Sequence, residues 1–251
     1  MSTRVKPSAF SGVKLIVKRE LGQYLSTWAG YVIAAAMLLL SGLLFNVFAL
    51  GSSPRYSADV LSDYFFYTSG TTITAGILLS MRLIAEERAA GTLPLLTTSS
   101  LTDGQIIIAK YFSALASLAL FLLLTIYMPA LVLYSGKISL GHVFAGYLGL
   151  LLIGSSSIAI GLFGSTVVKS QLVAAIVAGV ITVVMLSLWM TARVVEGPLG
   201  DVVGYLALHD KHFRPFMDGN VSTSNVVFYL SVTAFFLVLS RNVLEGRRWR
   251  A

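Results

Sequence analysis

The chain has 251 residues, of which 56% are hydrophobic and only 12% are charged, and its mean hydropathy is +0.83. Soluble domains carry about 25% charged residues, so this composition excludes an ordinary soluble protein. The absence of cysteine excludes disulfides, thiolate catalysis and metal sites built on cysteine. The net charge of +7 is typical of nucleic-acid-binding proteins, but in so apolar a chain it indicates membrane orientation, and we expect no nucleic-acid partner.

Six long apolar stretches run along the chain, and the first, 29–50, contains no Asp, Glu, Lys, Arg or His. About 20 apolar residues cross the hydrocarbon core as an α-helix, and lipid requires every backbone polar group to be paired internally. We therefore predict an all-α integral membrane protein in which 1–251 form a single transmembrane domain. The predicted spans are 29–50, 64–84, 112–135, 142–164, 171–191 and 225–240, the third kinked by Pro129.

The segment 1–28 is predicted to form a basic amphipathic helix in the headgroup plane, where it would contact membrane lipid. Its apolar stripe consists of Val13, Val17, Leu21, Leu25 and Trp28, and Lys14 and Lys18 lie off this stripe. A simpler alternative is an anchor that only binds anionic lipid. The first span is too long for a cleavable signal peptide, so we expect it to remain in the protein.

Lys and Arg are distributed unevenly over the segments that flank the predicted spans. Thirteen lie in the segments that include both termini, and five lie on the other side. Because positive charge stays in the cytoplasm, we expect both termini, including the tail 241–251, to be cytoplasmic.

The spans contain no ionisable residue in their inner parts, although ion-coupled transporters and proton pumps usually place such residues there. Their Ser and Thr side chains are expected to bond mostly to the backbone of their own helix. The only Gly-Lys pair, Gly136–Lys137, is followed by Ile138 and does not form a P-loop. No nucleophile elbow or zinc-protease motif is present either. We therefore expect no enzyme, cofactor or metal site in this chain. Either something other than an intramembrane charge supplies the energy, or the protein is not an active transporter.

Two further patterns leave alternatives open. Small residues spaced four apart allow close helix packing, either in a dimer seam or within the chain. These ladders are Ser157, Gly161 and Ser165, and Ala174, Ala178 and Thr182. His209, Asp210 and His212 have a spacing that would suit a metal ligand pair, but solvated interfacial residues are the default interpretation.

The loop after the second span has the features of a docking element. A helix is predicted to end at Gly91, and Thr92 would cap a new short helix with Pro94 in its first turn. Leu93, Leu95 and Leu96 would give that helix an apolar side for the groove of a soluble partner. The spacing of Ser100 and Asp103 predicts the cap of the next helix. The alternative is a helical hairpin packed on the bilayer surface.

At these residues the chain resembles the membrane subunit of type-2 ABC exporters. That family has an E-E-R-x-x-G-T-L-x-x-L-L-T segment after its second span, and this chain reads Glu86-Glu87-Arg88-Ala89-Ala90-Gly91-Thr92-Leu93-Pro94-Leu95-Leu96-Thr97. The family's Gly-Lys before the third span is Ala109-Lys110 here, so alanine replaces the glycine. Lys18-Arg19-Glu20-Leu21, with Trp28 and Tyr31, resembles the family's elbow helix.

The C-terminal part resembles the gliding-motility-associated subgroup of that family. The similar positions are Leu208-His209, Phe213, Phe216, Gly219, Tyr229-Leu230 and Arg247-Arg248-Trp249. The chain departs from the subgroup pattern in having Asp218 before Gly219 and Val221 to Ser224 after it.

The resemblance implies a permease subunit in the bacterial inner membrane, paired with a second permease, identical or different. Cytosolic ABC ATPase subunits would bind the short helix around 92–98 and hydrolyse ATP with Mg²⁺. The external segment 192–224, with Gly197 and Pro198, would dip partly back into the membrane. Two alternatives remain: a subunit that transmits force to a periplasmic or envelope partner without transport, and a passive scaffold or channel.

Overall fold

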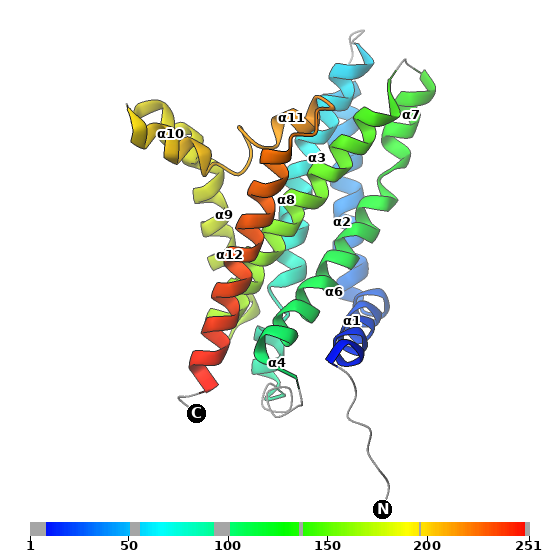
Figure 1. Cartoon of the computed structure of the whole chain (residues 1–251). Helices are drawn as coiled ribbons and strands as arrows, with labels where there is room; N and C mark the ends of the chain where they lie inside the picture. Colours follow the sequence, from blue (N-terminus) through cyan, green and yellow to red (C-terminus); the bar gives the residue numbers. More distant parts are fainter. Residues whose placement is uncertain (1–8, 51–55, 93–100, 136–137, 196, 249–251) are drawn as a thin grey trace, which may run out of the picture.

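The computed structural model describes residues 9–50, 56–92, 101–135, 138–195 and 197–248 (Figure 1). Within these residues every regular element is a helix. The helices are α1 (Ala9–Ser26), α2 (Trp28–Leu44) with its π-helical extension η1 (Phe45–Leu50), α3 (Ser57–Ser80), α4 (Ala85–Ala89), α6 (Asp103–Leu124), α7 (Tyr127–Ser135), α8 (Leu140–Val167), α9 (Gln171–Val194), α10 (Pro198–Tyr205), α11 (Arg214–Met217) and α12 (Thr223–Arg248).

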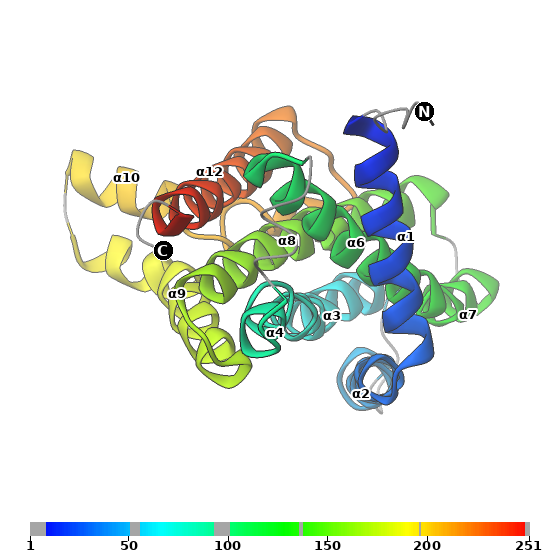
Figure 2. The ribbon, with the colours of Figure 1, turned by 90° about the horizontal axis from the view of Figure 1, so that it is seen from below.

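Five helical segments of the described chain are long and apolar enough to cross a membrane, which agrees with the prediction of an all-α, multi-pass membrane protein. They are Gly30–Leu50, Asp103–Tyr134, Leu140–Val167, Gln171–Val194 and Thr223–Gly246. The predicted span 64–84 corresponds to α3, which runs beside these helices but is more polar and is not among the five (Figures 1 and 2). The span predicted at 225–240 is longer than expected, because α12 continues to Arg248.

The long helices run up and down between two ends of the bundle (Figure 1). One end carries α1, α4 and the C-terminal end of α12, and we call it the α4 end. The opposite end carries α7, α10 and α11, and we call it the α10 end. The first and last helices thus meet the same end of the bundle.

Helix α8 is the most enclosed of the five apolar helices, and it packs mainly against α3, α12 and α9. Glycines allow these close approaches: a Cβ at Gly164 would lie 2.8 Å from the carbonyl oxygen of Ala174 on α9. A Cβ at Gly161 would collide with Ser80 on α3. Both small-residue ladders are therefore used for packing within the chain.

The third span begins earlier than predicted and is broken as predicted. It starts at Asp103 rather than 112, and α6 and α7 are separated at Thr125 and Ile126, four residues before Pro129. Proline has no N–H to donate to the Thr125 carbonyl. That oxygen instead accepts the N–H of Met128 at 3.1 Å and the hydroxyl of Tyr64 at 3.5 Å.

Hydroxyl side chains within the bundle bond mostly to the backbone of their own helix, which confirms the expectation from sequence. Thr72 donates to the carbonyl of Thr68 at 2.7 Å, and Ser157 donates to that of Ile153 at 2.9 Å. These bonds satisfy the hydroxyls without a charged partner. In lipid such internal pairing replaces the hydrogen bonds that water would supply.

Helix α1 lies across the α4 end of the bundle, at a steep angle to α2 (Figure 2). The side that packs on the bundle carries Ile16, Glu20 and Tyr24, all buried. Of the predicted apolar stripe, Val17 and Leu21 are half-buried, and Trp28, at the start of α2, is 88% exposed. The face of α1 that meets the bundle thus contains a carboxylate.

The contact between α8 and α9 yields a stability prediction. Gly164→Leu should lower the free energy of unfolding by about 1–3 kcal/mol, because the new side chain meets backbone that cannot rotate away. Gly179→Leu on α9 is the matched control, since no atom outside its own helix lies within 4 Å of a Cβ built there. The measurement is the thermal unfolding midpoint in detergent. Equal midpoints for the two variants would contradict the close α8–α9 contact.

Candidate functional site

The chain between α3 and α6 is attached to the end of α8. After α3 ends at Ser80, a turn over 81–84 leads into α4. Ser165 of α8 accepts the backbone N–H groups of Ile84 and Ala85 at 3.0 and 2.9 Å. These two N–H groups begin a helix and would otherwise lack an intrahelical partner. The small hydroxyl of Ser165 therefore holds the start of α4 against α8.

Helix α4 ends at Ala89, and Gly91 lies just after its C-cap residue, Ala90, close to the helix end that the sequence predicts, although α3 and α4 are separate helices. Gly91 has a φ of +69°, its N–H donates to Arg88 O at 3.2 Å, and the N–H of Thr92 donates to Glu87 O at 2.9 Å. This is a Schellman motif, which favours glycine at the left-handed position. The prediction that Thr92 caps a new helix, with Leu93, Leu95 and Leu96 on one side, concerns residues that lie outside the described chain after Thr92.

Helix α6 begins with a capping box, but not at the predicted residues. Thr102, rather than Ser100, is the N-cap: its hydroxyl accepts the N–H of Gln105 at 3.3 Å. The Gln105 side chain accepts the N–H of Thr102 at 3.0 Å in return. Both Ser100–Asp103 and Thr102–Gln105 have the three-residue spacing of a capping box, and α6 uses the second pair.

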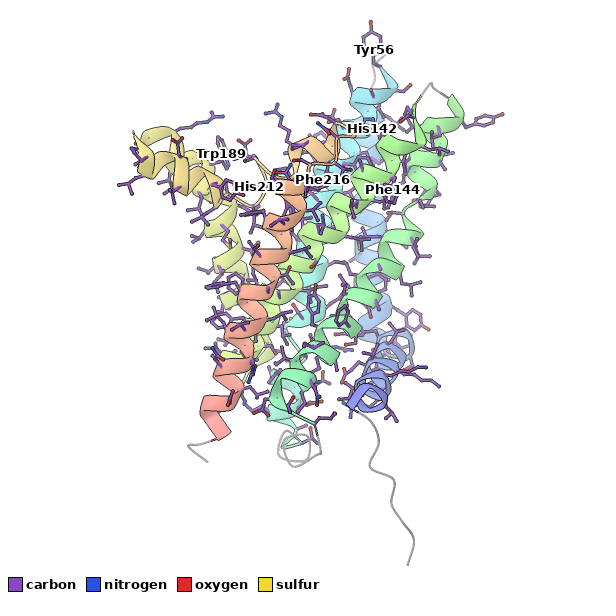
Figure 3. The ribbon with its side chains drawn as sticks, viewed as in Figure 1. Tyr56, His142, Phe144, Trp189, His212 and Phe216 are labelled. Atoms are coloured by element: carbon purple, nitrogen blue, oxygen red, sulfur yellow. The ribbon has the colours of Figure 1, made fainter. Side chains whose placement is uncertain are left out.

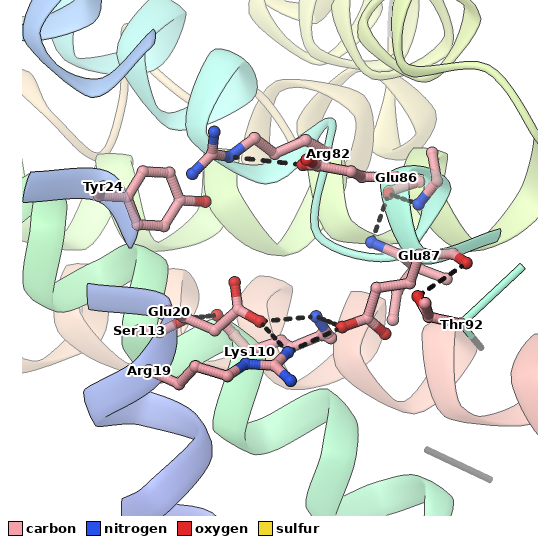
Figure 4. Close-up of polar contacts among 12 residues, drawn as sticks. Arg19, Glu20, Tyr24, Arg82, Glu86, Glu87, Thr92, Lys110 and Ser113 are labelled. Atoms are coloured by element: carbon pink, nitrogen blue, oxygen red, sulfur yellow. Dashed lines mark hydrogen bonds and ion pairs between the residues drawn. The ribbon is translucent and has the colours of Figure 1, made fainter. Parts of the chain in front are cut away.

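Four charged residues from three helices meet at the α4 end, and we call this cluster the charged junction (Figure 4). It consists of Arg19 and Glu20 on α1, Glu87 on α4 and Lys110 on α6. Lys110 Nζ lies 3.1 Å from Glu20 Oε1 and 2.8 Å from Glu87 Oε1. Arg19 Nη2 lies 2.8 Å from the same Glu20 atom and 3.0 Å from the same Glu87 atom. Two cations thus share two carboxylates across three elements.

Three of the four side chains of the charged junction are largely removed from water. The Lys110 side chain is 1% exposed, and those of Glu20 and Glu87 are 7% and 12% exposed, whereas Arg19 is 49% exposed. Burial by itself would raise the pKa of the Glu20 carboxyl, but Lys110 and Arg19 outweigh it and lower that pKa. The hydrogen bond to Glu20 raises the pKa of Arg19. The three buried charges are therefore stabilised only while their partners stay in place.

Two arginines extend this arrangement around the junction. Arg88 donates to the carbonyls of Val168 at 2.8 Å and Thr166 at 3.0 Å, at the C-terminal end of α8. A cation at this position complements the negative end of the helix dipole. The Arg82 guanidinium lies 4.1 Å from the centroid of the Tyr24 ring, and the Tyr24 hydroxyl donates to Leu79 O at 2.5 Å. Burial raises the pKa of Tyr24 to about 12, so this hydroxyl keeps its proton.

The predicted docking residues of α4 therefore have different tasks. Glu87 and Arg88 point into the protein and tie α4 to α1, α6 and α8. Glu86 is exposed and only approaches Arg82, at 4.0 Å. On α1, Arg19 and Glu20 belong to the junction, and Lys18 is exposed. A cavity of about 470 Å³ lies between α1, α4 and α6, with these charged groups on its wall.

At the α10 end, several residues of the segment that was predicted to be external are packed rather than solvated. Phe213 and Phe216 are fully buried, and His212 is stacked on Phe228 at 3.7 Å between ring centroids. Figure 3 shows His212 and Phe216 at this end of the bundle. His212 Nε2 donates to Tyr205 O at 2.8 Å, and Nδ1 lies 2.9 Å from Asn225 Oδ1. The default interpretation of His212 as a solvated residue is therefore wrong.

His209 is half-buried, and it does not share a ligand site with His212. Its Nε2 lies 2.9 Å from Ser69 Oγ on α3, and burial lowers its pKa. Among the described residues, no group of three or more His, Asp or Glu is placed to hold a metal. Gly197, with a φ of +83°, and Pro198 form the turn from α9 into α10, which projects sideways from the bundle (Figure 1).

A long groove runs along α3 between α2 and α9, with a volume of about 680 Å³. Its walls are apolar and include Met37 of α2 and Leu186 of α9. Its floor is α3, which contributes Ser69, Thr71 and Thr74 beside apolar residues, with Gly70 and Thr74 exposed. The groove ends at the α10 end, where it reaches His209 and the residue that follows it.

Comparison of the sequence with protein-family models and with curated proteins finds no match. The resemblance to type-2 ABC permeases therefore depends on the sequence motifs of the chain alone.

The charged junction yields a prediction for stability. Lys110→Met should destabilise the protein by about 3–5 kcal/mol, because it leaves two buried carboxylates with one shared cation. Arg241→Met breaks an exposed pair with Glu245 and should cost at most about 1 kcal/mol. Adding Glu20→Gln and Glu87→Gln to Lys110→Met should restore most of the loss. Unfolding midpoints measure all three, and an unrescued triple variant would contradict an electrostatic cause.

The lowered pKa of Glu20 predicts a pH dependence of stability. The ionised Glu20 carboxylate contributes its full stabilisation of the folded state above pH 4.5, the ordinary pKa of the group. This stabilisation is lost as the pH falls through the lower pKa that Glu20 has in the folded state. In Glu20→Gln, the unfolding midpoint should therefore decrease less steeply between neutral and acid pH than in the parent protein. Glu245→Gln, at an exposed position on α12, is the control and should keep the parental slope. Parallel curves for Glu20→Gln and the parent would contradict the prediction.

Proposed function

We propose that this chain is the permease subunit of an ABC exporter in the bacterial inner membrane. In this proposal α3 is a sixth crossing, α1 is the elbow helix, and the α4 end faces the cytoplasm. A separate cytosolic subunit binds ATP with Mg²⁺ and docks on the segment 93–100. The charged junction is the observation that carries the proposal.

The junction supports a role in transmitting force from this segment. Both ends of 93–100 are held by defined structures: the Schellman motif at Gly91 on one side and the capping box at Thr102 on the other. Glu87 and Lys110 tie these two ends to each other. A force applied to the segment 93–100 would therefore be transmitted to α1 and α6 together.

The contacts of α4 with α8 extend this path into the membrane. Arg88 and Ser165 join α4 to the end of α8, the most enclosed of the five apolar helices. Helix α8 in turn packs along α3, which forms the floor of the groove. A displacement at the docking segment would thus be passed to the groove through contacts between rigid helices.

The groove supports a role in substrate passage. The flanking helices α2 and α9 are largely exposed, and a second permease facing them would close the groove into a pathway. The hydroxyl side chains of α3 in the floor contrast with the apolar sides that α2 and α9 present elsewhere to lipid. This arrangement accounts for a polar helix within an otherwise apolar bundle.

The test is association with the ATPase encoded by a neighbouring gene. Leu95→Glu should abolish copurification of that ATPase and the ATP hydrolysis stimulated by the complex, because a charge enters the apolar side of the docking segment. Ser99→Glu is the matched control, since it adds the same charge at a polar position of the same segment and should retain binding. Unchanged copurification of Leu95→Glu, at parental expression and membrane insertion, would contradict the docking role of 93–100.

A further inference from the structure

The groove between α2, α3 and α9 differs in character along its length. Toward the α4 end its lining is aliphatic, with Ile33 and Leu78. Toward the α10 end aromatic rings gather: Phe66 and Tyr67 of α3 meet edge to face at 5.2 Å, and Phe66 meets the His209 ring at 5.3 Å. Trp189 of α9 adds an indole ring at the same end (Figure 3).

Charged side chains of both signs surround this aromatic end. Among the described residues that line the groove itself, Asp210 is the one charged side chain. Asp210 also lines an adjoining cavity of about 470 Å³, which shares Phe66, Tyr67 and His209 with the groove and adds Asp63, Asp218 and Arg214. A second adjoining cavity brings Arg193 and Lys211 near Asp210, and the Arg193 guanidinium lies 4.6 Å from the centroid of the Trp189 ring. The attraction of the groove for a cation therefore depends on Asp210 together with the rings of Phe66 and Tyr67.

We infer that the groove binds an amphiphilic organic cation, with its apolar body along α2 and α3 and its positive head among the rings and Asp210. Aromatic faces attract cations, most strongly where water is excluded, and a nearby carboxylate adds a Coulombic attraction. An anionic amphiphile would meet the same rings but would be repelled by Asp210, the charged residue of the described groove lining. The volume of about 680 Å³ lies in the range of sites for small organic ligands.

This inference deepens the proposed function by naming a substrate class, and it rests on that proposal for its biological meaning. The binding itself needs no ATPase. It can therefore be tested on the purified full chain, apart from the docking segment.

A pair of ions of nearly equal size and shape gives a direct test of the charge preference. Tetraphenylphosphonium is the cationic probe and tetraphenylborate the anionic one. Trp189 reports on the groove in a Trp28→Phe/Trp249→Phe background, in neutral detergent micelles. We expect saturable quenching of Trp189 by the phosphonium and at least about tenfold weaker binding of the borate.

Two variants locate the binding. Asp210→Asn should weaken phosphonium binding about tenfold, whereas Asp59→Asn removes the same charge from an exposed site on α3 outside the groove and should leave binding unchanged. Gly70→Leu should abolish binding, because a Cβ there meets no atom within 4 Å and the side chain extends into the groove. Leucine is a better helix former than glycine, so this variant should fold.

Several results would overturn the inference: equal binding of the two ions, equal effects of Asp210→Asn and Asp59→Asn, or parental binding in Gly70→Leu. Absent binding by a chain that is dimeric in micelles would also overturn it, because a second copy would then fill the groove. Leu95→Glu should keep full phosphonium binding. Phosphonium binding by a parent chain that copurifies no ATPase would contradict only the proposed function, and ATPase copurification by a parent chain that binds no phosphonium would contradict only this inference.

Discussion

Lys110 carries its charge where water does not reach, and the α4 end of the protein depends on how that charge is paired. A buried ammonium is costly unless carboxylates surround it. Glu20 and Glu87 meet this requirement from two other helices, and Arg19 balances the second carboxylate. The pairing therefore fixes α1, α4 and α6 relative to one another with a specificity that apolar packing alone would not provide.

The bundle above this junction follows a different constraint. Its backbone and hydroxyl groups are paired locally, as the hydroxyl bonds of Thr72 and Ser157 illustrate, and charge is kept to the two ends. Helix packing then depends on shape, and α8 approaches its neighbours through glycine. Electrostatics thus sets the geometry at one end of the protein, while close packing sets it along the length of the helices.

Much of this architecture is predictable from the sequence, because apolar runs and helix signals are local. The kink near Pro129, the glycine at the end of α4 and the helix before the first span could all be predicted from a few neighbouring residues. The charged junction could not, because its partners lie up to 90 positions apart and meet only through tertiary structure. A carboxylate at position 20, one turn from Ile16 and Tyr24, was the available signal.

The two histidines at the α10 end show the opposite limit of prediction from sequence. His209 and His212 are polar and close in sequence, which favoured a shared, solvated role, but the turn between α10 and α11 directs them to different helices. Composition alone does not reveal such a divergence. The predicted start of α6 at Ser100 failed for a related reason, since the neighbouring Thr102 has the same capping chemistry.

The glycine contacts of α8 also restrict how this protein can change shape. Gly161 and Gly164 bring backbones so near that sliding or rotation of α8 against α3 or α9 would drive atoms into each other. Helix α2, by contrast, is mostly exposed, and at Gly42 it meets α7 with only the side-chain ends of Met128 and Tyr127 within 4 Å of a Cβ built there. If the groove widens, α2 would therefore move, while α3, α8 and α9 would keep their positions relative to one another.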